Sequence, residues 1–140
     1  MIRPKKFNAF TLLELIVVIL IVGILATLGF VQYQSVIEKG RTAEGVNTLG
    51  TLRKLQMAYY QELGAYMNTA ELAVKASVPT GMSYACSNAN YYFQYRVLLY
   101  YIYAFRCTSG GKTPNNTSGN YYLRLDMRTG AKYSFPPGKW

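Results

Sequence analysis

The sequence predicts an α+β fold in which a long N-terminal helix packs on a small antiparallel β-sheet of about four strands. Three features lead to this prediction. An apolar run covers residues 10–31, and apolar residues spaced three and four apart continue as far as Leu63. Beyond residue 91, aromatic residues fill two segments that favour strands. Near the end of the chain, apolar and polar residues alternate as they do in a half-buried strand.

Length and charge set the first limits on function. The chain has 140 residues, which leaves room for one small domain after the apolar run. Its 15 Lys and Arg outnumber its 6 Asp and Glu, which gives a formal net charge of +9. Such a basic surface attracts nucleic acid, anionic lipid or acidic glycan, or serves only solubility.

The titratable residues exclude most catalytic chemistry. The chain has no His, which rules out His-based catalysis and His metal ligands. Only Asp126 is acidic after Glu71, so the C-terminal part has no pair of carboxylates for acid–base catalysis or for a calcium site. We therefore expect no enzyme activity, no metal and no cofactor.

The N-terminal part is organised for a membrane. Residues 1–9 are short, basic and without acid, and residues 10–34 are expected to form a hydrophobic transmembrane helix. The run from Phe10 to Val31 would be about 33 Å long as a helix, enough to cross a bilayer core. Because the basic leader stays in the cytoplasm, the rest of the chain is expected outside. One acid, Glu14, interrupts this pattern and would cost about 2.5–3.5 kcal/mol at the bilayer centre.

The segment from Lys5 to Leu15, KKFNAFTLLEL, resembles the class III signal sequence of type IV pilins and type II secretion pseudopilins. The resemblance implies that a prepilin peptidase cuts between Ala9 and Phe10 and then methylates the new amino terminus of Phe10. It also implies an inner-membrane assembly platform and a cytoplasmic assembly ATPase as partners. The chain departs from the family in having Ala9 where Gly is usual, and in lacking a Pro late in the apolar run.

Glu14 has a physical role that does not depend on the resemblance. Cleavage would create a positive amino terminus at Phe10, and Glu14 of a neighbouring subunit can neutralise it. In a low-dielectric setting this pair fixes the axial register, because a slide by one turn leaves two charges unpaired. The alternative is an acid that snorkels or stays protonated in the anchor of a simple single-pass membrane protein.

Residues 35–140 are expected to form the soluble domain. Its first part, residues 35–63, continues the helix with one apolar face, and Gly64 is a natural helix stop. A connecting region follows at residues 64–90, with a short helix expected at residues 69–75.

Residues 91–140 are expected to supply the sheet. Two aromatic segments come first, residues 91–97 and 100–106, and a buried helix across their junction is the alternative because the junction lacks Gly and Pro. The best hairpin signal in the chain joins residues 121–127 to residues 132–135. The alternation places four residues of this hairpin on the inner face: Tyr121, Leu123, Leu125 and Met127.

Two further features bear on function. Cys86 and Cys107 are expected to form a disulfide outside the cytoplasm, and two buried free thiols are the alternative. Exposed tyrosines and basic side chains could also form a stacking and phosphate-binding surface for DNA. The basic residues of this candidate surface are Arg96, Arg124, Arg128 and Lys132.

The sequence thus predicts a structural subunit of a type IV pilus-like filament, with other copies of itself as the main partner. The precursor would be stored in the inner membrane as a single-pass protein, and the processed chain would polymerise through its N-terminal helix into an extracellular filament. The alternatives within the resemblance are a type II secretion pseudopilin and a DNA-binding minor or competence pilin.

Overall fold

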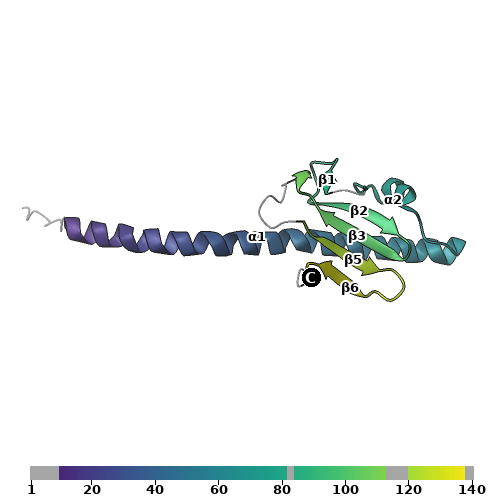
Figure 1. The fold of residues 1–140 in the computed structure, drawn as a ribbon, viewed down its shortest axis with the longest axis horizontal. Helices are drawn as coiled ribbons and strands as arrows, with labels where there is room; N and C mark the ends of the chain where they lie inside the picture. The colour runs from purple at the N-terminus through teal and green to yellow at the C-terminus, as the bar shows by residue number, and fades with distance from the viewer. Residues whose placement is uncertain (1–9, 82–83, 113–119, 138–140) are drawn as a thin grey trace, which may run out of the picture. The chain divides into compact units, whose positions relative to one another are not determined.

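The computed structural model describes residues 10–81, 84–112 and 120–137 (Figure 1). Internal contacts divide the chain into two units, one ending at Glu38 and the other starting at Lys39. Helix α1, Leu12–Leu63, belongs to both units and confirms the long N-terminal helix predicted from the sequence. It ends where expected, because Gly64 adopts a φ of +69°, a conformation that favours glycine.

The described part of the first unit is helical, and it begins with an apolar stretch. Every side chain from Phe10 to Phe30 is exposed. By length and composition, this part of α1 is able to cross a membrane. A helix that is apolar on all sides needs lipid or other helices around it, so this surface requires an environment that the chain itself does not provide.

The second unit contains the predicted antiparallel sheet of four strands. The strands are β2 (Phe93–Leu98), β3 (Tyr101–Arg106), β5 (Tyr122–Asp126) and β6 (Lys132–Phe135). They are hydrogen-bonded in the order β2-β3-β5-β6, and every neighbouring pair is antiparallel. Because β2 and β3 form a hairpin, the alternative helix across their junction is excluded.

One face of this sheet packs on the later half of α1 (Figure 1). Leu49 and Leu52 of the helix enter a core with the inward residues of the strands. The four hairpin residues predicted to face inward are all buried, Tyr121, Leu123, Leu125 and Met127. Thr42 of α1 also shares a 3.0 Å hydrogen bond with the hydroxyl of Tyr121, so a polar contact supplements the apolar one.

The connecting region is tied to α1 by a buried side chain. The amide of Gln56 donates to the carbonyl of Met67 and accepts from its N–H, at 3.1 and 2.8 Å. Helix α2 (Thr69–Ala76) follows and confirms the predicted short helix. Asn68 and Glu71 form a capping box that satisfies N–H groups at its start.

A second, smaller sheet is present that the sequence did not predict. Strand β1 (Ala85–Cys86) pairs in parallel with β4 (Ser109–Gly110), inside a region expected to be a loop. The Cys86–Cys107 disulfide, which confirms the predicted pairing, lies beside it. Its sequence separation of 21 corresponds to about 3 kcal/mol of stabilisation in the chain-entropy model.

The close approach of helix and sheet depends on Gly45. A Cβ at this position would lie 3.0 Å from Cε2 of Phe93, whose ring is fully buried. A Cβ at Gly50, one and a half turns further along α1, would meet nothing within 4 Å. The two glycines therefore differ in function, although both weaken the helix by about 1 kcal/mol relative to Ala.

We predict that Gly50→Ala raises the free energy of unfolding by about 1 kcal/mol. Gly45→Ala should fall short of that gain by about 1–3 kcal/mol, because the new methyl group must displace the Phe93 ring. Urea unfolding of the full chain in detergent, followed by near-ultraviolet circular dichroism, measures both. Equal stabilisation by the two substitutions would show that the helix and the sheet are not closely packed at Gly45.

Candidate functional site

The start of α1 places Glu14 in a capping box. The backbone N–H and the hydroxyl of Thr11 each donate to Oε2 of Glu14 at 2.8 Å. The N–H of Glu14 in turn donates to Oγ1 of Thr11 at 3.3 Å. This reciprocal pattern satisfies backbone groups at the helix start that have no partner within the helix.

The cap gives Glu14 a second physical role beside the charge pair expected from the sequence. Its signal, Thr followed three residues later by Glu, was present in the sequence and was not recognised. Phe10 is 84% exposed and immediately precedes the cap. Ala9, on the other side of the predicted cleavage point, lies outside the described residues.

The four basic residues proposed for a DNA surface lie in three different places. Arg96 and Arg124 are on the face of the sheet opposite to α1, which we call the outer face. Arg128 lies in the turn between β5 and β6. Lys132 pairs with Leu125, a buried residue of the inner face, so the pleat directs it to the opposite side from Arg124.

The outer face carries a row of alternating arginines and tyrosines. The row crosses all four strands, each residue opposite the next: Arg96, Tyr103, Arg124 and Tyr133. Tyr101 and Tyr122 flank it on β3 and β5. The strand register brings these residues together from positions up to 37 apart in the sequence. The alternation within one strand shows which face a residue lies on but not which residues of other strands lie beside it, so the sequence did not predict the row.

Arg124 is enclosed by aromatic rings. Its guanidinium carbon lies 4.5 Å from the ring centre of Tyr101 and 4.3 Å from that of Tyr133. Neighbouring rings also contact one another, since Tyr122 and Phe135 are stacked with centroids 5.7 Å apart. Tyr84 meets Phe105 edge-on, and burial, together with the nearby Tyr122, raises the pKa of the Tyr84 phenol. Its hydroxyl therefore remains a neutral hydrogen-bond donor.

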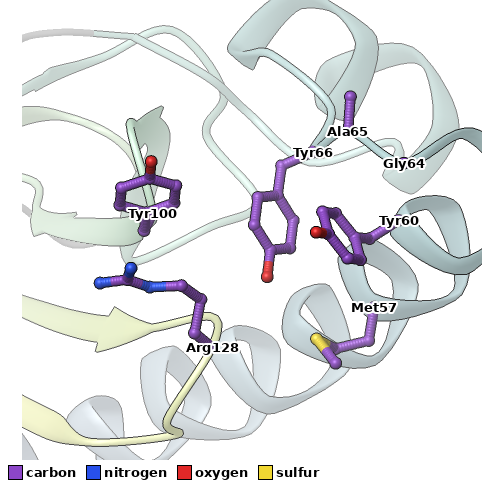
Figure 2. A pocket seen from close by; sticks show the side chains of 7 residues that line it. All are labelled: Met57, Tyr60, Gly64, Ala65, Tyr66, Tyr100 and Arg128. Atoms are coloured by element: carbon purple, nitrogen blue, oxygen red, sulfur yellow. The ribbon is translucent and has the colours of Figure 1, made fainter.

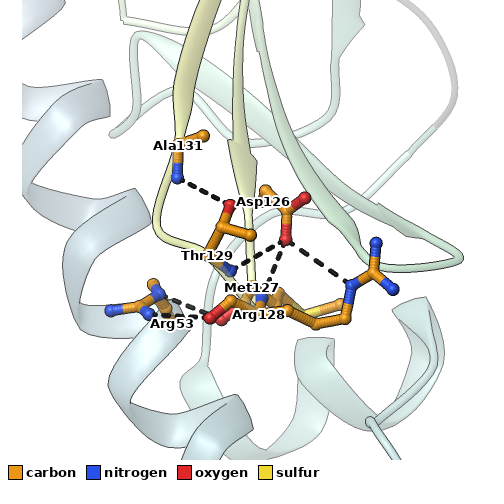
Figure 3. Close-up of polar contacts among 6 residues, drawn as sticks. All are labelled: Arg53, Asp126, Met127, Arg128, Thr129 and Ala131. Carbon is orange, nitrogen blue, oxygen red and sulfur yellow. Dashed lines mark hydrogen bonds and ion pairs between the residues drawn. The ribbon is translucent and has the colours of Figure 1, made fainter.

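The turn after β5 is held by Asp126 and by α1 (Figure 3). Oδ1 of Asp126 accepts from the N–H groups of Arg128 and Thr129 at 2.8 and 3.2 Å. From the helix, Nε of Arg53 donates to the carbonyl of Met127 at 3.0 Å. These contacts fix the last residue of β5 to the helix that supports the sheet.

The same contacts determine the charge of Asp126. Burial of the carboxyl group raises its pKa, but the hydrogen bonds from Thr129 and Arg128 and the charge of the Arg128 guanidinium outweigh this effect. Nε of Arg128 lies 3.9 Å from Oδ1. The pKa of Asp126 is therefore lower than its ordinary value of 3.8, and the carboxylate is ionised at neutral pH.

A pocket of about 660 Å³ opens where α1 ends (Figure 2). Tyr60 and Tyr66 stack at 4.7 Å beside it, and the guanidinium of Arg128 lies 4.0 Å from the ring centre of Tyr100. Its aromatic groups thus already contact one another or a cation. Met57 completes the apolar part of the lining. Within the described ranges, no three acidic, cysteine or histidine side chains gather into a metal site.

Comparison with known proteins gives two matches. Residues 4–30 match the family model of the prokaryotic N-terminal methylation motif. Over 49 residues the chain is 37% identical to a protein of Dichelobacter nodosus named "Probable minor fimbrial protein". This stretch covers 35% of the chain and 31% of that protein, so the chain spans about a third of the curated relative that it matches. No solved structure matches the chain.

We predict that Asp126→Asn lowers the stability of the second unit at neutral pH. The pKa of Asp126 is depressed in the folded chain, so its stabilising effect is complete above the unfolded value of about 3.9 and disappears as pH falls through the folded value. The difference in urea midpoint between wild type and variant should therefore shrink below about pH 4.

The full chain in detergent, unfolded in urea at several pH values between about 7 and 3, provides this measurement. Glu62→Gln, which removes an exposed acid from α1, controls for the loss of one negative charge. A constant difference between wild type and Asp126→Asn across this range would contradict the assigned role of the ionised carboxylate.

Proposed function

We propose that this chain is a structural subunit of a type IV pilus-like filament, since its methylation motif and its fimbrial relative both support the type IV pilin family. The name of that relative favours a minor subunit over an abundant one. The role is assembly rather than catalysis. The observation that carries the proposal is the apolar, exposed first part of α1, which has a single acid near its start.

In this proposal the exposed apolar surface is covered in two environments, one after the other. Before assembly, lipid covers the helix in the inner membrane, with the second unit outside. After assembly, the equivalent helices of other copies cover it in the filament core. Both states bury the same side chains, at a gain of about 25 cal/mol for each Å² of apolar surface removed from water. The free energy of transfer between them therefore depends on packing and on charges such as Glu14.

In this mechanism, processing removes the leader, residues 1–9. We propose that a prepilin peptidase cuts between Ala9 and Phe10 and methylates Phe10, as the motif over residues 4–30 supports. The cut would place a positive amino terminus next to the capping box. An inner-membrane assembly platform and a cytoplasmic assembly ATPase are the further partners that we propose.

Glu14 of each subunit would then have two roles. Its Oε2 holds the helix start through Thr11, and its charge is available to the amino terminus of a neighbouring copy. A cap contributes about 1 kcal/mol to helix stability, whereas loss of one partner from a buried charge pair costs about 3–5 kcal/mol. The charge pair therefore contributes more than the cap, and it sets the axial register between subunits.

We predict that the protein extracted from filaments or membranes lacks residues 1–9 and carries one added methyl group at Phe10. Intact-mass spectrometry measures both changes together. Replacement of Ala9 by a bulky residue such as Leu should leave the leader attached, because the peptidase cuts after a small residue. A full-length mass for the wild-type chain in its native membrane would overturn the processing proposal.

We predict that Glu14→Gln abolishes filaments while leaving processing intact. Gln retains the oxygen that accepts from Thr11 but has no charge, so the variant separates the charge pair from the cap. Thr11→Ala is the matched control, since it removes the hydroxyl that accepts from the N–H of Glu14 and retains the carboxylate. Electron microscopy of material sheared from cells measures filament number, and intact mass checks cleavage.

The two variants give opposite results under the two roles. Filaments from Thr11→Ala and none from Glu14→Gln support the charge pair. Normal filaments from Glu14→Gln, with loss in Thr11→Ala, would show that capping is the essential function and would overturn the register proposal.

A further inference from the structure

The outer face has a chemistry that the filament role does not explain. The row of Arg96, Tyr103, Arg124 and Tyr133 places two cations among phenol groups on one side of the sheet. Tyr133 is 44% exposed and Phe135 beside it is 59% exposed. An aromatic surface left open to water in this way marks an interaction site.

The rings of this face are arranged with their flat sides against one another. Tyr103 and Phe105 are nearly parallel, with an interplanar angle of 6° and centroids 5.8 Å apart. Tyr122 and Phe135 stack at 19°, and Tyr101 and Tyr133 cover Arg124 at less than 5 Å. Each of these contacts covers one flat side of a ring, and Tyr133 and Phe135 remain exposed, so the face offers a ligand the remaining ring sides together with phenol hydroxyls and the edges of guanidinium groups.

These hydroxyls are available for a ligand. In the part of the chain that the structure describes, none of four tyrosines uses its hydroxyl in a hydrogen bond: Tyr101, Tyr103, Tyr122 and Tyr133. Each phenol can both donate and accept. The face therefore combines several unpaired hydroxyls with two positive charges.

The charge distribution indicates an anionic occupant from outside the chain. The acids of the second unit are dispersed, and most are already hydrogen-bonded: Glu44 to Tyr92, Glu71 in the α2 cap and Asp126 in its turn. Glu62 remains as an isolated exposed acid on α1. The described part of a second copy thus has no acidic patch to place against Arg96 and Arg124. An external polyanion carries the negative charges that these two arginines would bind.

Two observations favour a polysaccharide over a nucleic acid. Stacking of bases requires open ring faces, and here Arg124 or a neighbouring ring already covers one face of Tyr101, Tyr133, Tyr122 and Phe135. Duplex DNA carries about one charge per 1.7 Å, which calls for many cations, while this face has two guanidinium groups among a larger number of hydroxyls. A hydroxyl-rich polymer with one carboxylate on each sugar matches this ratio better than duplex DNA does.

We propose that the outer face binds an acidic polysaccharide, a uronate polymer with hydroxyls and a carboxylate on each sugar. The guanidinium edges of Arg96 and Arg124 contact the carboxylates, and the phenol hydroxyls contact the sugar hydroxyls. The proposal goes beyond the filament role and does not depend on it, because the face belongs to one copy of the chain.

The test measures binding of the full chain in detergent to immobilised polygalacturonate at about 0.1 M salt. Amylose, single-stranded DNA and duplex DNA serve as comparison surfaces. We expect Arg96→Gln with Arg124→Gln to weaken polygalacturonate binding about tenfold or more, as hydrogen bonds to charged groups predict. Tyr103→Phe with Tyr122→Phe keeps both rings and should weaken it about fivefold.

The matched control is Lys39→Gln with Lys54→Gln, which removes the same charge from exposed positions on α1 and should leave binding unchanged. Circular dichroism melting verifies the fold of each variant. If Arg124→Gln disturbs the ring stack, Arg96→Gln alone still tests the surface.

Three results would overturn the proposal. The first is no binding to polygalacturonate. The second is a loss of polygalacturonate binding in the Lys39→Gln, Lys54→Gln control equal to that in the Arg variant, which would show attraction by net charge alone. The third is tighter binding to either DNA than to polygalacturonate, lost in the same Arg variants, which would establish a nucleic-acid surface instead.

Discussion

The packing of α1 against the sheet is the interaction on which the second unit depends. Gly45 allows the helix to approach Phe93, and Leu49 and Leu52 then reach the buried side chains of the strands. The same contact decides which face of the sheet is covered and which remains open. It also anchors the turn after β5, since Arg53 reaches the Met127 carbonyl from the helix. The outer face is thus a consequence of where the helix lies.

At the other end of α1, one carboxylate has a local role in the helix cap and an assembly role in the proposed filament. Glu14 accepts hydrogen bonds from Thr11, so the helix start is satisfied within a single copy. The charge remains after these bonds are made, and an apolar environment makes an uncompensated charge expensive. An acid in a membrane helix is costly. The position of Glu14 is nevertheless consistent with a stable helix start and with the proposed fixed contact between copies.

On the outer face, the tertiary structure changes how the many tyrosines and arginines of the sequence are interpreted. Many tyrosines beside arginines suggested base stacking, but the rings stack on one another and on Arg124 instead. The phenol hydroxyls and guanidinium edges that remain accessible beside the exposed Phe135 ring suit the hydroxyl and carboxylate groups of the proposed ligand. Lys132, which the sequence grouped with Arg124, lies on the other side of the sheet because its register partner is the buried Leu125.

The sequence by itself determined the features that repeat along the chain or lie close together in it. These were the long helix and its stop at Gly64, the short helix α2 and the β5–β6 hairpin, because periodicity and turn residues report them directly. The β2–β3 hairpin and the Cys86–Cys107 disulfide were predicted with an alternative still open, and the structure decided them. Only the tertiary structure decided the β1–β4 pair, the special role of Gly45 and the Arg–Tyr row. Each depends on hydrogen bonds or contacts between distant segments, and strand register, which no single segment contains, sets which side chains meet.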